Sequence, residues 1–164
     1  MQFKKTFLII LIISMLLFFL GMFFPMDIGK DEGSVEISFN ELFFHNLRAQ
    51  FTSILLGIMT LGIYSLFYMF LNFLLLGMVV TTLNQTESLI DVVQTIIFHG
   101  FFEIPAMLLS ITLGIFTPWK IILMIKNKNF NFDSLRVIFS ISILIVILTI
   151  IAAFIESLIS QNML

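Results

Sequence analysis

The feature that most constrains this chain is its series of long apolar runs. The first run, Thr6 to Phe24, follows two lysines and is long enough to cross a hydrocarbon core of about 30 Å at about 1.5 Å per helical residue. Only 11% of the 164 residues are charged, against about 25% in an ordinary soluble domain. Such a chain has too little polar surface to cover a water-soluble core, so we expect an integral membrane protein in contact with the lipid bilayer.

Composition also excludes several classes of function. The absence of Cys rules out disulfides, iron–sulfur clusters and Cys-based zinc or nucleophilic chemistry. A net charge of −2, without a block of basic residues, offers no surface for a nucleic-acid backbone. No hydrophilic stretch is long enough to form a soluble catalytic domain. We therefore expect residues 1–164 to form a single membrane domain.

The apolar runs predict an all-α polytopic bundle of about five transmembrane helices. An acidic outer loop is expected at 25–41 and a basic cytoplasmic loop at 126–136. Gly57 and Gly62 permit a tight turn around Leu61 and Gly62 between two of the spans. The five expected spans are 6–24, 42–60, 62–83, 102–119 and 137–155.

A helix break is expected in the long apolar stretch from Leu89 to Ile125. Its middle reads FHGFFEIPAM, where Gly100 and Pro105 interrupt regular hydrogen bonding. We predict a broken helix at His99–Pro105, with a re-entrant hairpin as the alternative. Broken helices are tolerated at membrane depth where protein or a cavity surrounds them.

The distribution of Lys and Arg predicts the orientation in the cell membrane. Lys4 and Lys5 favour a cytoplasmic N-terminus, and Lys126, Lys128 and Arg136 favour a cytoplasmic last loop. An even number of crossings must then separate these two segments. Five spans satisfy this condition and leave the C-terminus outside.

Rare polar and small residues recur at helical spacing inside the apolar runs. Small residues let helices approach closely, and Asn, Gln and Ser hydrogen-bond across such contacts. Because residues at this spacing share one helix face, we expect three stripes to meet in a compact bundle. The stripes are Asn46, Gln50, Ser53 and Gly57; then Gly62, Ser65 and Asn72, with Gly77 on an adjoining strip; and His99, Glu103, Ala106, Ser110 and Gly114.

His99 and Glu103 are the strongest candidates for a functional site, because a carboxyl group inside a span is costly and marks a relay, a pathway or a buried pair. Three interpretations stay open: an ion pair between Glu103 and Arg48, a proton or cation path through His99 and Glu103, and a metal site completed by His45 or Glu41. The candidate buried polar site comprises Asn46, Arg48, Gln50, Asn72, His99, Gly100, Glu103 and Pro105.

Motifs of hydrolytic enzymes are absent from the sequence. There is no H-E-x-x-H pair of zinc ligands, and no Ser lies in the strained turn that a serine hydrolase needs. We therefore expect a non-enzymatic protein without a cofactor, and assign no residue a catalytic or metal-binding role.

The order of these motifs between about Leu42 and Ile125 resembles the stage II sporulation protein M family. Asn46 opens one helix, Gly57 and Gly62 close it, and the stretch HGFFEIPAMLLSITLG begins at His99. The family pattern has an N-N pair, spaced glycines, an N-G pair and an H-G-x-x-E-x-P-A block. Here the N-N pair reads His45-Asn46 and the N-G pair reads Asn72-Phe73.

The resemblance implies an all-helical membrane protein of Gram-positive type without recognised enzymatic activity. The resemblance implies that the sporulation member of the family holds cell-wall-degrading partners at the membrane, as an anchor. Short relatives occur beside bacteriocin genes, where they are linked to export and self-protection. The altered pairs, and the short MQFKK before the first span, favour the second context. The expected function is a scaffold or accessory subunit that assembles with an ABC-type exporter or a cell-wall hydrolase complex. We also expect it to give immunity to a membrane-active bacteriocin. A homo-oligomer is one arrangement that the sequence leaves open. The alternative is a small transporter or channel with a buried His/Glu relay.

Overall fold

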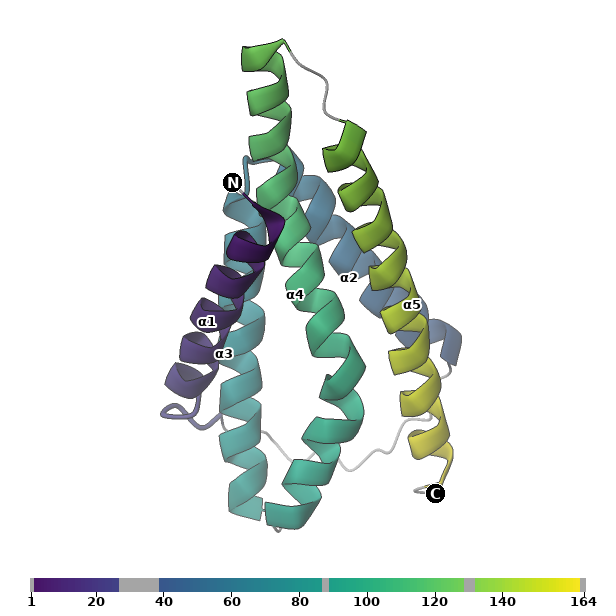
Figure 1. The fold of residues 1–164 in the computed structure, drawn as a ribbon. Helices are drawn as coiled ribbons and strands as arrows, with labels where there is room; N and C mark the ends of the chain where they lie inside the picture. The colour runs from purple at the N-terminus through teal and green to yellow at the C-terminus, as the bar shows by residue number, and fades with distance from the viewer. Residues whose placement is uncertain (1, 27–38, 87–88, 129–131, 163–164) are drawn as a thin grey trace.

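The computed structural model describes residues 2–26, 39–86, 89–128 and 132–162, and for residues 86, 89–99 and 159–162 it describes the backbone alone. These residues form helices and short connections, without a strand in the described ranges, which confirms the predicted all-α membrane bundle (Figure 1). The helices are α1 (Phe3–Gly21), α2 (Phe39–Met59), α3 (Ile63–Thr86), α4 (Leu89–Asn127) and α5 (Phe132–Asn162).

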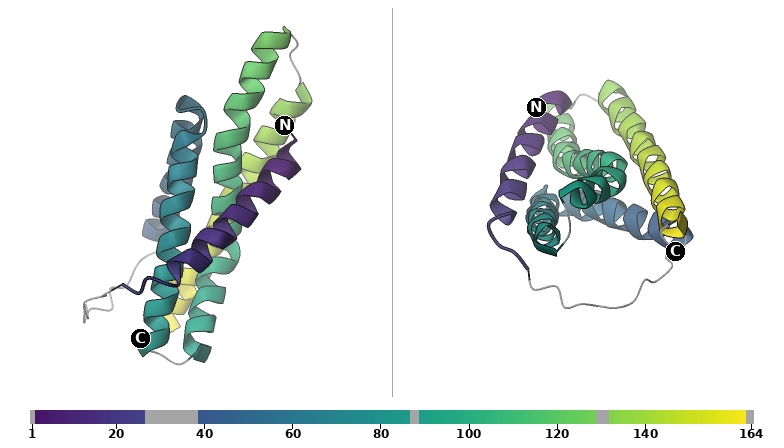
Figure 2. Two further views of the ribbon diagram at one scale, coloured as in Figure 1. Left: turned by 90° about the vertical axis from the view of Figure 1, so that its left-hand side faces the viewer. Right: turned by 90° about the horizontal axis from the view of Figure 1, so that it is seen from below.

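Helix α4 is the centre of the bundle. It packs against each of the other four helices, and the view along the bundle shows them arranged around it (Figure 2). In an apolar stretch of 18 residues taken from each spanning helix, 50% of the residues of α4 are buried. The corresponding share is 17% in α1, 28% in α3 and 22% in α5. The helix that carries Gly100, Glu103 and Pro105 is therefore held by protein on several sides.

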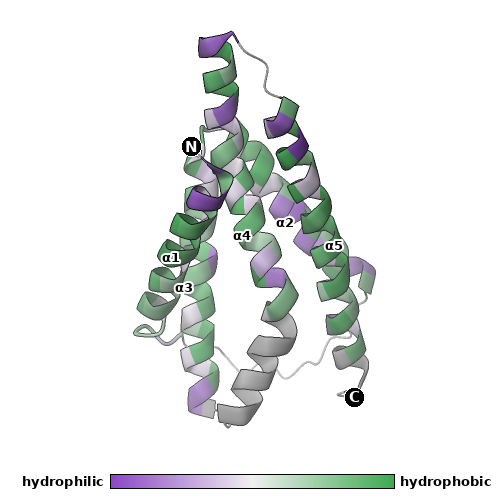
Figure 3. Cartoon of the chain, in the orientation of Figure 1, coloured by the Kyte–Doolittle hydropathy of each residue, from purple (hydrophilic) through white to green (hydrophobic). Residues whose placement is uncertain are grey.

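The outward faces of the helices are apolar, and polar residues gather toward the two ends of the bundle (Figure 3). By length and composition, four helical segments are able to cross a membrane: 3–21, 63–85, 100–127 and 132–158. The remaining predicted span, 42–60, corresponds to α2, which carries Glu41, His45 and Arg48 and falls outside this group. In Figure 1, α2 runs obliquely behind α4.

The predicted break at His99–Pro105 is wrong. Helix α4 continues through His99, Gly100 and Pro105 and also contains Pro118, so neither a short separate helix nor a re-entrant hairpin forms. Proline removes one backbone donor, and neighbouring helices can support the interrupted turn in a membrane bundle. Because α4 contacts all four other helices, its packing overrides this local preference. The helix bends in its lower half rather than ending (Figure 1).

The predicted tight turn between α2 and α3 is confirmed. Leu61 and Gly62 adopt positive φ values of 55° and 97°, and the Gly62 amide donates to the Gly57 carbonyl oxygen at 2.7 Å. Glycine tolerates this left-handed backbone without steric cost, and the amide bond across five residues closes the end of α2. The expected outer loop is largely outside the described residues, because 27–38 are not described. The expected cytoplasmic loop is shorter than 126–136, since α4 ends at Asn127 and α5 begins at Phe132.

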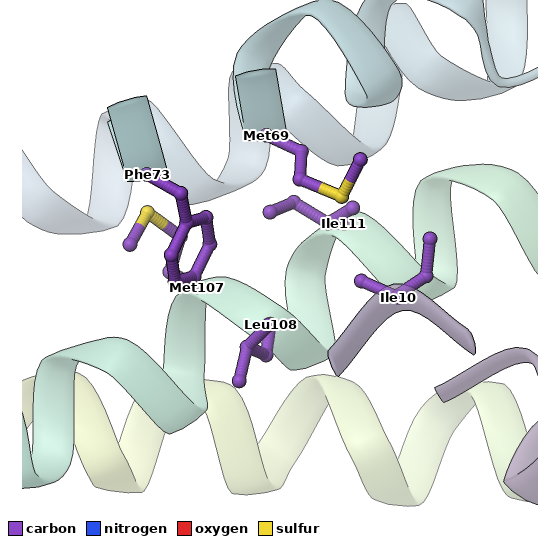
Figure 4. Close-up of a cluster of buried hydrophobic side chains, with 6 residues drawn as sticks. All are labelled: Ile10, Met69, Phe73, Met107, Leu108 and Ile111. Atoms are coloured by element: carbon purple, nitrogen blue, oxygen red, sulfur yellow. The ribbon is translucent and has the colours of Figure 1, made fainter. Parts of the chain in front are cut away.

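An apolar core joins α1, α3 and α4. Ile10 of α1 packs with residues of the two longer helices, and all six members of the cluster are at most 8% exposed (Figure 4). Burying a side chain of this size stabilises a fold in water by about 1.5–3 kcal/mol, whereas in lipid the gain comes from close packing. The cluster comprises Ile10, Met69, Phe73, Met107, Leu108 and Ile111.

The end of α1 packs closely against the backbone of α3 and forms hydrogen bonds with two threonine hydroxyls of α3. A Cβ built on Gly77 would lie 3.0 Å from the Gly21 Cα, so the two backbones touch at these positions. Thr81 Oγ1 then donates to the Met22 carbonyl oxygen at 2.9 Å, and the Met26 amide donates to Thr82 Oγ1 at 2.9 Å. These bonds satisfy main-chain groups where α1 has ended, which keeps the exit of the helix against α3.

Candidate functional site

The three predicted stripes meet at one junction of α2, α3 and α4. Ser65 Oγ of α3 donates a hydrogen bond to the Ser53 carbonyl oxygen of α2 at 2.8 Å. A Cβ built on Gly57 would overlap the Ser65 hydroxyl and lie 2.9 Å from the Gly114 Cα. A Cβ on Gly114 would likewise overlap that hydroxyl and lie 3.0 Å from the Ser53 oxygen. These small residues therefore set the separation of the three helices, as their spacing predicted.

Gln50 links α2 to α5 rather than to the other stripes. Its side chain is 2% exposed, and its Oε1 accepts a hydrogen bond from Thr149 Oγ1 at 2.8 Å. Asn46, one turn earlier, is half-buried on the same face of α2. Such a buried bond is worth about 0.6 kcal/mol on average between membrane helices, so it favours one register of α2 and α5 more than it adds stability.

The ion pair of Arg48 with Glu103 is one of three open interpretations of the polar residues. Arg48 lies at an exposed position of α2. The buried face of α2 is formed by Leu42, Gln50, Ser53 and Gly57, and a helix that buries these positions turns Arg48 outward. Arg48 is therefore separate from the polar groups inside the bundle.

A pocket of about 380 Å³ between α3 and α4 brings together Asn72, Gly100 and Glu103, three of the predicted site residues. The rest of its wall is apolar and includes Val80 and Met107. Asn72 Nδ2 donates to the Tyr68 carbonyl oxygen at 2.8 Å, one turn earlier in α3. Glu103 is half-buried and interacts within the chain. The polar groups thus occupy one part of an otherwise apolar cavity.

His99 and Pro105 lie in the same stretch of α4 as this pocket. The backbone of His99 is helical one turn before Glu103, while its side chain lies outside the described residues. Pro105 is half-buried inside the helix. Among the residues searched, no three His, Asp or Glu side chains come together as a metal site.

Several residues with structural roles were missed by the sequence reasoning. Thr149 lies within the expected span 137–155 and is not among the predicted site residues, but it is fully buried and bonded to Gln50. Thr81 and Thr82 were not singled out, although they bind the end of α1. The available signal was the rarity of hydroxyl side chains at spaced positions in apolar helices, which Ser142, Thr149 and Ser157 repeat along α5.

Comparison of the sequence with known proteins identifies its family. The chain is 27% identical, over 162 residues, to an uncharacterized protein of the archaeon Methanocaldococcus jannaschii, MJ0793, with 89% of this chain and 90% of that protein covered. No solved structure matches the chain. The family model described as Stage II sporulation protein M matches residues 5–161, which is almost the whole sequence. The chain belongs to the stage II sporulation protein M family.

Proposed function

We propose that this membrane protein is a non-enzymatic scaffold or accessory subunit. The observation that carries the proposal is the use of its polar stripes: Ser53, Gly57, Ser65 and Gly114 are consumed in joining α2, α3 and α4. Gln50 is likewise used to bind α5. Residues that pack between helices hold the bundle in one shape in the bilayer. A partner would therefore bind the outward faces or the two ends of the bundle.

The partner in this proposal is another membrane-associated assembly, either an ABC-type peptide exporter or a cell-wall hydrolase complex. Family membership and the motif resemblance support it. In the exporter context the protein also gives immunity to a membrane-active bacteriocin. The archaeal relative indicates that similar sequences are not restricted to Gram-positive bacteria.

A small transporter or channel is the second candidate. It is favoured by one observation, the half-buried carboxyl of Glu103 on the wall of the pocket between α3 and α4. An ionisable group at such a position in a membrane helix commonly marks an ion or proton pathway. His99, one turn earlier, is the other member of the proposed relay.

Purification in a mild detergent, followed by vesicle reconstitution, distinguishes the two functions. The scaffold function predicts that an exporter or a wall hydrolase elutes with the tagged chain at a fixed ratio, and that the chain alone moves no protons or cations above empty vesicles. A lone protein that conducts, and loses conduction in Glu103→Gln while Glu156→Gln retains it, would establish the transporter instead. Glu156 is a suitable control because it is also half-buried but lies on α5, away from the pocket.

The orientation proposed for the protein is N-terminus in the cytoplasm and C-terminus outside. Phe3 and Phe116 are in edge contact at 5.3 Å, so the start of α1 lies beside the last third of α4. The start of α1, the end of α4 and the start of α5 lie toward the same end of the bundle (Figure 1). These three segments carry Lys4, Lys5, Lys120, Lys126, Lys128 and Arg136. Concentration of basic residues at one end is typical of the cytoplasmic side.

Single-cysteine labelling tests this orientation without background, because the chain contains no Cys. Asn40 and Asn127 form a matched pair of exposed amides near opposite ends of the bundle. We expect an impermeant thiol reagent to label Asn40→Cys on intact cells and to label Asn127→Cys after lysis alone. The opposite pattern would reverse the orientation.

A further inference from the structure

We propose that the pocket between α3 and α4 binds a lipophilic amine, whose ammonium group is received by Glu103 and Asn72 and whose chain fills the apolar wall. This binding site goes beyond the scaffold function and does not depend on it. The inference rests on the size of the cavity, the donor and acceptor pattern of its two polar residues, and their position in a membrane bundle.

The cavity has the size and lining of a ligand site. Its volume of about 380 Å³ lies within the range of about 300–1,000 Å³ typical of small-molecule pockets. Leu75, Val79 and Leu83 of α3 contribute to one wall, and Ile104 and Met107 of α4 contribute to the other. Such sites are mostly apolar with a few polar groups that fix orientation, which is the composition found here.

Both described polar side chains on the wall offer acceptors to a ligand. Asn72 donates one of its two Nδ2 hydrogens to the Tyr68 carbonyl oxygen, and its Oδ1 is an acceptor that a ligand can use. Glu103 already interacts within the chain, but a carboxylate offers about four acceptor sites on its two oxygens and can receive a further donor. An ammonium group supplies three donors and no acceptor, and therefore complements both residues.

The same pattern disfavours the molecules that most often fill apolar pockets in a bilayer. A phospholipid phosphate carries negative charge, and in this pocket it would lie beside the Glu103 carboxylate. An uncharged alkyl chain has no donor, so it would form no hydrogen bond with the Glu103 carboxyl or the Asn72 amide. Two like charges repel strongly when they are desolvated, whereas opposite charges attract. The Glu103 carboxylate therefore favours a cationic amine over an anionic or neutral ligand.

Photolabelling of the full chain in phosphatidylcholine vesicles tests the assignment. The probes are dodecylamine and dodecanol, each with a diazirine on the alkyl chain, and mass spectrometry locates the labelled residues. We expect the amine to label pocket residues of α3 and α4. Glu103→Gln should lower that labelling about tenfold, or by about 1.4 kcal/mol, because a hydrogen bond to a charged group is lost. Labelling by dodecanol should be weaker and unchanged by Glu103→Gln.

Matched variants keep the test decisive. Glu156→Gln removes a half-buried carboxyl outside the pocket and should leave amine labelling unchanged. If Glu103→Gln does not give a monodisperse protein, Leu75→Trp fills the pocket from its exposed rim, and Leu66→Trp on the same helix is its control outside the pocket. Leu75→Trp should block amine labelling while Leu66→Trp retains it. Equal labelling by the two probes, or labelling insensitive to both pocket variants, would overturn the proposal and leave the cavity as a site for lipid tails.

Discussion

Gly57→Ala and Gly114→Ala are each expected to destabilise the protein by about 2–3 kcal/mol, which thermal unfolding in detergent will detect as a lower melting temperature. Alanine favours a helix over glycine by about 1 kcal/mol, so the loss must come from the contact between helices. The added methyl group at either position would overlap the Ser65 hydroxyl and press on backbone atoms of the neighbouring helix. Backbone atoms cannot rotate away, and the three helices would have to separate.

Gly100→Ala is the matched control for these two substitutions. It lies in α4, as Gly114 does, but among the described side chains a Cβ there would meet only Ile104, with Cδ1 at 2.8 Å. The end of a flexible side chain can move, so we expect little change in stability. Adding Ser65→Ala to Gly57→Ala should recover part of the loss, because two residues in contact are coupled. Equal melting temperatures for Gly57→Ala, Gly114→Ala and Gly100→Ala would mean that the three-helix junction is not close-packed.

The junction was predictable from sequence for a physical reason. In a chain with so few polar side chains, the small and polar residues that do occur carry most of the information about which helix face is buried. Helical periodicity then places them on one face, and Ser53, Ser65 and Ser110 are all fully buried. The apolar positions carried less information, since Leu and Phe fit lipid as well as a neighbouring helix.

The errors have equally definite causes. Gly100 and Pro105 predict a helix break by a local rule, but α4 packs against four helices and a local rule does not include those contacts. Whether Arg48 pairs with Glu103 could not be decided from the sequence, because spacing along one helix does not fix how a second helix faces it. The bond between Gln50 and Thr149 joins residues 99 positions apart, and no pattern in a single sequence pairs them. The pocket that joins Asn72 to Glu103 likewise depends on the register of α3 against α4.

Gly77→Ala is expected to loosen α1 in particular. A Cβ at this position would overlap the Phe18 carbonyl oxygen and lie 3.0 Å from both the Gly21 Cα and the Met22 amide nitrogen. All three atoms belong to the backbone of α1 or its exit, so no side chain can relieve the overlap. The whole end of the helix must move away from α3, and the hydrogen bonds from Thr81 and to Thr82 would be lost with it.

The expected cost of Gly77→Ala is about 2–3 kcal/mol, concentrated in one helix. Since α1 packs only against α3 and α4 in the described ranges, it can detach while the junction of α2, α3 and α4 stays closed. Hydrogen exchange should therefore accelerate about tenfold or more in residues 3–21 and remain near the wild-type rate in α5, whereas Gly57→Ala should accelerate exchange across α2 and α3. Gly100→Ala again serves as the control with unchanged exchange in α1. Uniform acceleration over the whole chain in Gly77→Ala would contradict the expectation, because it would mean that α1 and the junction unfold as one unit.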